Sequence, residues 1–495
     1  MKTILAKLLS KFISKQEQAW ITNAVEEQEK LLLNLVNTAK NTKFGKDHNF
    51  ETINSHQDYT KAVSIQDYED LKPYIDQVRE GNKDILWPKT PKYFAKTSGT
   101  TSGAKYIPIS KDSLPYHIKA ARNALLRYIM NSNNADFVNG KMIFLQGSPV
   151  LEEENGIKMG RLSGIVAHYV PSYLQKNRMP SWETNSIPQW EEKVDAIVEE
   201  TMTENLTLIS GIPPWILMYF EKLQERTGKK IGEIFPNLQL IVTGGVNYEP
   251  YREKMNQYLG KKVDVIQTYP ASEGFIAYQD QLGKEDLLLL LNHGIFYEFV
   301  PVEEFGKPDA KRLSIGEVEL DTNYAVILTT NAGLWSYSIG DTVKFTSLDP
   351  YRIVVTGRIK HYTSAFGEHV IAQEVENALK NTLEKYKATV SEFHIAPQVN
   401  PVSGLPYHEW FIEFKEEPED LERFKNELDQ QVQNQNPYYF DLIDGKVLRP
   451  LEISFIQDNG FNLYMKSQGK LGGQFKLPRL ANDRNIADGL QPYIK

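Results

Sequence analysis

The segment KTSGTTSGAKYIP, at residues 96–108, brings together the residue types that bind phosphate groups. Small hydroxyl residues and glycines let backbone N–H groups and hydroxyls converge on phosphate oxygens, and a lysine adds positive charge. The segment is not a Walker A loop, because three residues rather than four separate its glycines and Tyr106 occupies the Ser/Thr position. We expect phosphate binding here, with a polar linker as the alternative. The candidates are Thr97, Ser98, Gly99, Thr100, Thr101, Ser102, Gly103 and Lys105.

A second candidate is QTYPASEG, at residues 267–274, which follows a predicted strand and turns sharply. Loops at the carboxyl ends of parallel strands are where α/β sheets bind ligands. Tyr269 could flank a base, and the Glu273 carboxylate suits Mg²⁺, although a solvated loop carboxylate is the alternative. Two glycines that end the preceding predicted strand would bring backbone to the same crevice. The further lining candidates are Gly244, Gly245, Ala271 and Ser272.

Three later segments carry polar groups that suit a nucleotide. In YSIGD, residues 337–341, Asp341 follows a glycine at an expected loop and could accept both ribose hydroxyls. Arg358 lies in GRIK, where the first domain is expected to end. The glycine-rich segment 469–479 holds Lys470 and Lys476, for which exposed tail charges are the alternative.

Absent patterns narrow the chemistry. The sequence has no cysteine, which excludes disulfides, thiolate zinc sites, iron–sulfur clusters and covalent thioester catalysis. Its nine histidines show no metal-ligand spacing, and neither a GxSxG nor a GxGxxG motif occurs. A formal net charge of -8 without a basic run disfavours nucleic acid and anionic membranes as partners.

Hydrophobic periodicity predicts the elements that position these residues. Helices are expected at residues 17–40, 113–131, 189–204 and 213–226, and strands at 238–242, 263–267, 317–320, 325–330 and 352–356. A helix at 248–259 between two strands indicates a parallel sheet, whereas the closer strands in 315–356 indicate an antiparallel or barrel-like subregion. An acyl pocket could be lined by residues 137–146, 159–169 and 213–220, which could equally be core.

The pattern changes near residue 358. Beyond it we expect helices at 370–385 and 420–435 and strands at 392–396, 409–414 and 451–455, with one apolar stripe on the second helix formed by Leu421, Phe424, Leu428 and Val432. The fold class is therefore α/β, with a large N-terminal domain (1–358) of parallel sheets and a barrel-like β subregion, and a small C-terminal α+β domain (359–495).

The N-terminal segment predicts an amphipathic helix with Ile4, Leu8, Leu9 and Phe12 on one face. Lysines interrupt any signal-peptide core, and no apolar run approaches the roughly 20 residues of a membrane span. We expect a surface helix docked on the protein, with membrane contact as the alternative. The chain is expected to be a cytoplasmic monomer without stable membrane insertion.

The order of these segments resembles the adenylate-forming superfamily of acyl-CoA synthetases, peptide-synthetase adenylation domains and luciferases. The details are most similar to the auxin-responsive Gretchen Hagen family of acyl acid amido synthetases, and specifically to a bacterial member. Thr97–Lys105 resembles its phosphate loop, Thr268–Glu273 its Tyr–Ala–Ser–Ser–Glu-like motif, and Tyr337–Asp341 its Tyr–Arg–x–Gly–Asp-like motif. The flanking TKFGKDHNF, YEDLKPYI, GIPPW and QFKLPR also match, so the resemblance covers nearly the whole chain. Ser338 stands where the family usually has Arg, and Pro270 and Ala271 precede a single Ser272.

This resemblance implies a ligase that uses ATP and Mg²⁺ to adenylate a carboxylic acid and then forms an amide with an amine, usually an amino acid. It implies that residues 97–105 hold the phosphates, Glu273 the Mg²⁺, and Asp341 and Arg358 the ribose. Gly244, Gly245, Tyr269 and Ser272 would line the adenine side, and Lys476, preferred over Lys470 for its Lys–x–x–Arg spacing, would be the catalytic lysine of a mobile C-terminal domain. The alternatives are an acid–CoA ligase that forms a thioester and a non-catalytic nucleotide-binding protein.

Overall fold

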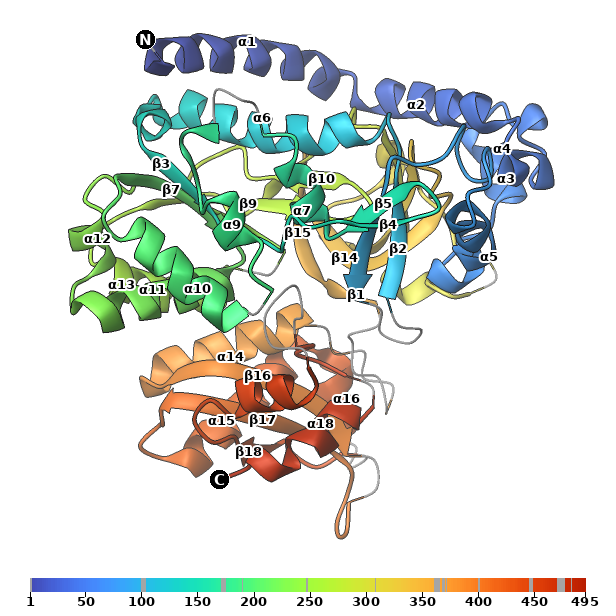
Figure 1. The fold of residues 1–495 in the computed structure, drawn as a ribbon. Helices are drawn as coiled ribbons and strands as arrows, with labels where there is room; N and C mark the ends of the chain where they lie inside the picture. Colours follow the sequence, from blue (N-terminus) through green and yellow to red (C-terminus); the bar gives the residue numbers. More distant parts are fainter. Residues whose placement is uncertain are drawn as a thin grey trace. The chain divides into compact units, whose positions relative to one another are not determined.

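The computed structural model describes residues 2–98, 104–170, 175–188, 190–245, 248–307, 309–359, 366, 370, 372–398, 401–444, 448–469, 477–481 and 483–495. It divides into two compact units, each with its own core (Figure 1). The first unit comprises Met1–Ile339 and Lys344–Val354, and the second comprises Gly340–Val343 and Val355–Lys495. The protein therefore has the mixed α/β architecture expected, with a large N-terminal part and a smaller C-terminal one.

An 11-stranded sheet forms the centre of the first unit, with the order β12-β13-β14-β15-β11-β10-β9-β8-β7-β3-β6. Its last five strands are parallel to one another, which confirms the parallel arrangement predicted from the strand–helix–strand spacing. These strands are β9 (Asp264–Pro270), β8 (Leu240–Gly244), β7 (Leu206–Gly211), β3 (Lys141–Phe144) and β6 (Arg178–Met179).

The pairings that the structure records on the other side of β9 are antiparallel, as expected for the later strands. They involve β10 (Phe275–Tyr278), β11 (Leu287–Leu289), β12 (Ile295–Pro301), β13 (Asn323–Thr330) and β15 (Tyr351–Arg358), and β14 (Tyr337–Leu348) lies between β13 and β15. The strand predicted at 317–320 is wrong, because a 3-10 turn, η4 (Ile315–Glu317), ends at Glu317 and Leu320 makes only an isolated bridge with Phe345. Ser314 and Glu317 form a capping box that satisfies backbone N–H groups locally and so replaces a strand ladder.

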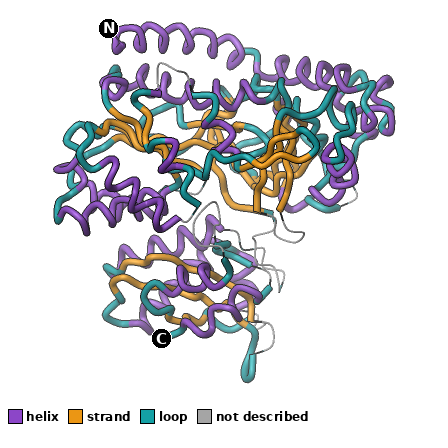
Figure 2. Tube along the Cα trace, viewed as in Figure 1, coloured by secondary structure: helices purple, strands orange, loops and turns teal. Residues whose placement is uncertain are grey.

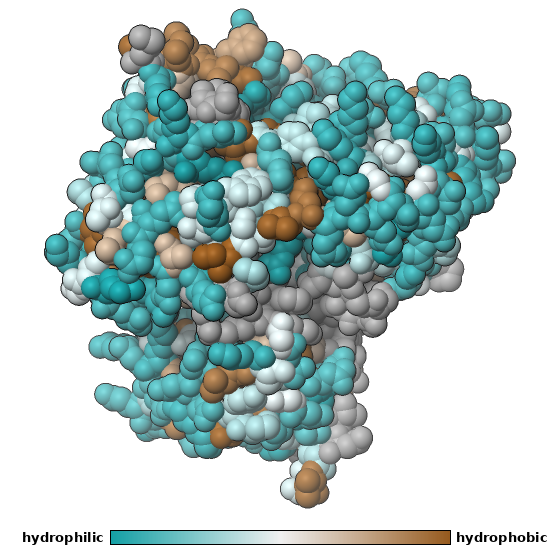
Figure 3. All heavy atoms as spheres, in the orientation of Figure 1, coloured by the Kyte–Doolittle hydropathy of each residue, from teal (hydrophilic) through white to brown (hydrophobic). Residues whose placement is uncertain are grey.

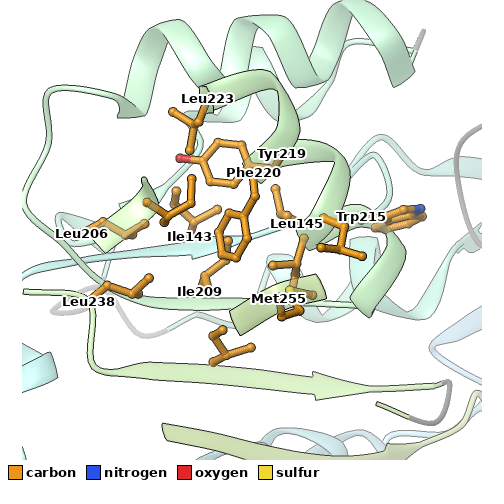
Figure 4. Packing of buried hydrophobic residues seen from close by; sticks show 14 of the residues in the cluster. Ile143, Leu145, Leu206, Ile209, Trp215, Tyr219, Phe220, Leu223, Leu238 and Met255 are labelled. Carbon is orange, nitrogen blue, oxygen red and sulfur yellow. The ribbon is translucent and has the colours of Figure 1, made fainter. Parts of the chain in front are cut away.

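Helices cover both faces of the parallel strands (Figure 1). Helix α6 (Leu114–Ser132) lies on one face, and α10 (Trp190–Thr201), α11 (Pro213–Thr227) and α13 (Glu249–Leu259) lie on the other. Figure 4 shows Trp215, Tyr219 and Phe220 of α11 packed with Ile143, Leu145 and Ile209 from the sheet. All of these except Ile209 belong to segments considered above for an acyl pocket or for core, and they lie in the hydrophobic core.

A separate four-stranded sheet carries the predicted phosphate loop. Its order is β2-β1-β5-β4, and β1 and β2 are antiparallel neighbours along the chain. The strands are β1 (Tyr93–Ser98), β2 (Ala104–Ile109), β4 (Glu152–Glu154) and β5 (Ile157–Gly160).

Two helices begin the chain, α1 (Lys2–Thr22) and α2 (Ala24–Ala39), so the helix predicted at 17–40 is divided at Asn23. The expected docking face of α1 is wrong, because the residues that it buries are Ser10, Ile13, Glu17 and Trp20. Ile4, Leu8, Leu9 and Phe12 are exposed instead. Within the described ranges, no helix combines the length and apolar character that a bilayer span requires.

The second unit is built on the sheet β16-β17-β18, formed by β16 (Thr389–Gln398), β17 (Tyr407–Glu416) and β18 (Glu452–Phe455) (Figure 2). Side chains alternate across it, so that Trp410 and Ile412 face the core with α14 (Ala372–Tyr386) and α15 (Leu421–Gln435). Phe411 faces the core with α17 (Gly460–Ser467) and α18 (Asn485–Leu490). The stripe predicted on α15 is buried at Phe424, Leu428 and Val432, whereas Leu421, at its first residue, is exposed.

Candidate active site

The β1–β2 hairpin places Lys105 beside the start of the Thr/Ser/Gly loop. Thr97 pairs with Lys105 across the two strands, and Ser98 pairs with Ala104. The Lys105 ammonium lies 5.5 Å from the centre of the Tyr68 ring, within reach of a cation–π interaction. The tip of the loop, Gly99, Thr100, Thr101, Ser102 and Gly103, lies outside the described residues.

Cations and aromatic rings frame the base of this hairpin, a feature that the sequence analysis missed. The Arg79 guanidinium stacks 3.9 Å from the centre of the Tyr106 ring and pairs with Glu154 at 2.8 Å. The Tyr106 N–H donates to the Tyr68 hydroxyl at 2.9 Å, which ties the hairpin to helix α5 (Tyr68–Arg79). Because α5 and the hairpin are far apart in sequence, no local spacing could have predicted this frame.

Ser272 and Glu273 occupy the middle of a tight turn between β9 and β10. Two backbone hydrogen bonds close the turn. The Ala271 N–H donates to the Gly274 carbonyl at 2.9 Å, and the Gly274 N–H donates to the Ala271 carbonyl at 3.2 Å. A Cβ at Gly274 would lie 2.4 Å from the end of the Ile295 side chain, which would have to shift to accept any larger residue. The turn predicted from QTYPASEG is confirmed, and it holds the half-buried Glu273 carboxylate at a fixed place at the end of β9.

The residues before this turn extend the strand further than expected. Thr268 pairs with Gly244 of β8 on one side and with Tyr278 of β10 on the other. Residues 268–270, predicted as loop, therefore belong to β9, because Thr268 has partners on both sides and the next two residues pair with β10. Tyr269 is only 8% exposed and pairs with Ala277.

Gly244 ends β8 at the same edge of the sheet. A Cβ at this position would lie 2.4 Å from the Thr268 carbonyl oxygen and 2.5 Å from its hydroxyl oxygen. Gly245 follows with φ of 78°, a left-handed conformation that favours glycine. The structure thus brings Gly244 and Gly245 next to the strand that carries Tyr269 and the turn with Ala271, Ser272 and Glu273.

Asp341 and Arg358 form an ion pair, with 2.8 Å between Oδ1 and Nε. YSIGD was expected to be a loop, but it lies within β14, and Arg358 ends β15. Gly340, with φ of 84°, accepts a hydrogen bond from the Ile359 N–H at 2.7 Å. The two side chains predicted to hold a ribose are therefore neighbours within the second unit, where the arginine is half exposed.

Lys470 and Lys476 lie outside the described residues, but the arginine that follows them is described. Arg479 pairs with Glu376 at 2.7 Å and with Glu392 at 3.4 Å, and its guanidinium lies 5.0 Å from the centre of the Phe393 ring. Burial raises the pKa of Glu392, and the charge of Arg479 opposes this rise. Arg479 thus fixes the end of the predicted lysine segment to α14 and β16.

Lys193 is a second feature that the sequence analysis missed. Its ammonium donates to the backbone carbonyls of Gln146 at 3.0 Å and Asn185 at 2.7 Å, just beyond the carboxyl end of β3. Burial lowers its pKa to about 8, and the nearby Arg161 contributes to this shift. A shifted pKa at the ligand edge of an α/β sheet is typical of functional sites. The available signal was its helical spacing, since Lys193 shares a buried face of α10 with Ile197 and Thr201.

Comparison with known proteins places these features in one family. Residues 13–188 match the GH3 family N-terminal domain, residues 288–358 the GH3 family central domain, and residues 373–485 the GH3 family C-terminal domain. Together the three matches span most of the chain in the same order as the candidate motifs.

Curated relatives are similar at low identity. A jasmonoyl–L-amino acid synthetase, JAR4 of Nicotiana attenuata, is 23% identical over 58% of this chain and 60% of its own length. A 4-substituted benzoates-glutamate ligase, GH3.12 of Arabidopsis thaliana, is 23% identical over 85% of this chain and 87% of its own length. The match to JAR4 thus spans less than two thirds of that protein.

A solved structure shares the fold over nearly the whole chain. The GH3.15 acyl acid amido synthetase superposes with a TM-score of 0.80 at 15% identity and covers 97% of this chain and 96% of its own. At this identity the likeness establishes the fold. With the three domain matches in sequence order, the chain belongs to the GH3 family.

Proposed function

We propose that this protein is an ATP-dependent acyl acid amido synthetase. The observation that carries the proposal is the match of three GH3 domains in order, with the candidate motifs inside or between them. The geometry of the first unit supports it, because Gly244 and the Glu273 turn end neighbouring parallel strands at the edge where α/β sheets bind ligands.

In the first step, a carboxylate oxygen of the acid attacks the α-phosphorus of ATP, and pyrophosphate leaves. Negative charge accumulates on the phosphate oxygens, so fixed donors and cations directed there lower the barrier. Residues 97–105 would supply hydroxyls, backbone N–H groups and the Lys105 ammonium. Lys476 of the second unit would supply a further positive charge, and Asp341 with Arg358 would hold the ribose.

In the second step, the amine nitrogen attacks the carbonyl carbon of the acyl-adenylate, AMP leaves with the bonding electron pair, and the nitrogen loses one proton to solvent. The mixed anhydride divides one difficult substitution into two easier ones. Jasmonate and substituted benzoates are different acids, whereas an amino acid appears in the names of both relatives. We therefore propose an amino acid as the amine and leave the acid to be identified.

Glu273 fits the requirements of a Mg²⁺ ligand. Mg²⁺ is usually bound by one or two carboxylates together with substrate phosphates, and it neutralises phosphate charge when bound. Across the described ranges no group of three metal-binding side chains is found. A single carboxylate in a rigid turn at the ligand edge therefore matches a metal that is shared with ATP.

The cellular setting and the movement of the units complete the proposal. The enzyme would act as a cytoplasmic monomer, and its C-terminal domain, residues 359–495, would move relative to residues 1–358 between the two steps. A pivot near Arg358–Lys360 follows from the family resemblance.

The test is pyrophosphate release from Mg·ATP against a panel of carboxylic acids, each with pooled amino acids, with coenzyme A, or with neither. Acid-dependent release with an amide product is the expected result. Glu273→Gln should lower this turnover at least about 100-fold while the thermal unfolding midpoint stays constant, since one preorganised charge contributes about 3 kcal/mol to such barriers. A thioester product with coenzyme A would assign the protein to the acid–CoA ligases. Calorimetric ATP binding without pyrophosphate release for any acid would indicate a non-catalytic nucleotide-binding protein.

A further inference from the structure

Helix α1 presents a row of apolar side chains to solvent. Ile4 is 65% exposed, Leu5 59%, Leu8 59%, Leu9 42% and Phe12 58%. Figure 3 shows hydrophobic residues gathered over the N-terminal half of this helix, at the top of the view. We call Ile4, Leu5, Leu8, Leu9 and Phe12 the apolar face of α1. An isolated exposed leucine is ordinary, but five such side chains within nine residues form a continuous patch.

The opposite face of the same helix is fixed to the first unit. Ile13 and Trp20 are buried there, and Glu17 accepts hydrogen bonds from Arg127 at 2.6 Å and Asn123 at 3.1 Å. The Tyr278 hydroxyl also donates to Glu17. Because these contacts hold α1 on α6 and β10, the helix cannot rotate to bury its apolar face against its own chain.

The charged side chains that α1 itself places beside the apolar face have one sign. Lys2, Lys7, Lys11 and Lys15 lie on α1, and no Asp or Glu precedes Glu17, which is buried. The next exposed carboxylate along the chain is Glu26, 11 residues beyond Lys15. Glu26 belongs to α2, beyond the break between the two helices at Asn23. One exposed acid lies near the start of α1: Asp136 belongs to η2 (Asp136–Asn139), whose Asn139 donates a hydrogen bond to Thr3 at 3.1 Å. Four lysines against this one acid make the region locally cationic, although the whole chain has a formal net charge of -8.

We propose that the apolar face of α1 binds the surface of an anionic phospholipid bilayer. The helix lies parallel to the bilayer, its apolar side chains enter the boundary between headgroups and acyl chains, and its lysines contact lipid phosphates and carboxylates. A symmetric contact between two copies of this face would bring four lysines from each together without an exposed acid of α1. An anionic lipid surface supplies the missing negative charge, so charge complementarity favours lipid over a second copy.

The first test is sedimentation of the full-length protein with large vesicles of phosphatidylcholine alone or with 30% phosphatidylserine. We expect at least about tenfold stronger binding to the anionic vesicles, as several lysines near a charged surface should give. The double variant Leu8→Gln/Phe12→Gln and the triple variant Lys7→Gln/Lys11→Gln/Lys15→Gln should each lose at least about 90% of that binding. Val150→Gln/Val402→Gln, at exposed apolar positions elsewhere, should bind as the parent does.

A second measurement detects vesicle binding directly and does not depend on a variant that loses it. Phe12→Trp should show a blue-shifted, brighter fluorescence with anionic vesicles, and Val402→Trp, which is fully exposed in the second unit, should not. Acid-dependent pyrophosphate release without vesicles should be unchanged in the Leu8→Gln/Phe12→Gln variant, since both side chains are exposed on α1 and neither belongs to the candidate site. Equal binding to both kinds of vesicle, or no binding to either, would overturn the proposal. A dimer in light scattering that the double variant abolishes would assign the face to a second copy instead.

Discussion

The ion pair between Asp341 and Arg358 predicts a kinetic effect that is separate from stability. Arg358 is half exposed, and exposed ion pairs contribute little to the free energy of unfolding. A charge-assisted hydrogen bond to a ribose hydroxyl is worth about 1.5–3 kcal/mol. Asp341→Ala should therefore raise KM for ATP at least about tenfold, with kcat and the thermal unfolding midpoint nearly unchanged.

A matched control exists within the same unit. Glu427 pairs with Lys385 at 2.6 Å, and the side-chain exposures of 18% and 59% resemble the 15% and 50% of the Asp341–Arg358 pair. Glu427→Ala should leave KM for ATP unchanged. An unaltered KM in Asp341→Ala would remove this residue from the ribose site.

Buried histidines predict sensitivity to acid. Burial lowers the pKa of His117 from its ordinary 6.5 to about 4, and that of His293 to about 4 as well. Between pH 6.5 and pH 4 the unfolded chain binds more protons than the folded protein does. The contribution of each histidine to the free energy of unfolding is therefore fully present above pH 6.5 and falls as the pH drops towards 4. Each group should cost about 2 kcal/mol of unfolding free energy between pH 7 and pH 5.

The check is urea unfolding at pH 7 and pH 5 for the parent and for His117→Leu, which keeps the volume but cannot titrate. We expect the difference between the two pH values to shrink by about 2 kcal/mol in the variant. The same difference in both proteins would show that His117 does not cause the acid sensitivity.

At the scale of elements, the approach of β8 to β9 depends on one missing side chain. Gly244→Ala would place a methyl group 2.4 Å from the Thr268 carbonyl oxygen, a backbone atom that can move only with its strand. Overpacking of this kind costs about 1–3 kcal/mol. Because the same strands end at the candidate nucleotide site, calorimetry should also show at least about tenfold weaker ATP binding.

Gly156→Ala is the control, because it introduces backbone strain at a glycine outside the edge formed by β8 and β9. Gly156 has φ of 77° and open space where a Cβ would lie, so its replacement should cost about 1–2 kcal/mol in backbone strain without affecting ATP. If Gly244→Ala bound ATP like the parent, the edge formed by β8 and β9 would not be the nucleotide site.

Elements with one apolar stripe were predictable because the signal is local. Helices α6, α11 and α15 begin and end within one residue of the predicted bounds. Residues 268–270 and 337–341 were expected to be loops but belong to strands. The backbone groups that pair with them are distant in sequence and so leave no local signal. The Ser338 N–H, for example, donates to the Gln66 carbonyl. Helix α1 has apolar residues on two faces, and its contacts with α6 and β10 decide which one is buried.

At the scale of the molecule, the candidate motifs could be placed in order along the chain, but their meeting in space could not. Tyr68, Arg79 and Tyr106 frame the phosphate hairpin through contacts that join α5 to β2. The prediction that residues 359–495 form a domain that moves relative to residues 1–358 stays a prediction. Each unit nevertheless has a core of its own, and that property can be tested separately.

Two isoleucines, one in each core, test whether the units unfold independently. Ile209 of β7 and Ile412 of β17 are both fully buried, and truncation of such a side chain to alanine costs about 2–5 kcal/mol. If each core is a cooperative unit, hydrogen exchange should accelerate only in the unit that carries the substitution. Ile209→Ala should deprotect β7, β8 and β9 while β16 and β17 keep their parent rates, and Ile412→Ala should do the reverse. Mass spectrometry of peptides from both sheets measures this directly. Equal deprotection of both sheets by either substitution would mean that the chain unfolds as one body, and a domain movement between the two half-reactions would then need a different structural basis.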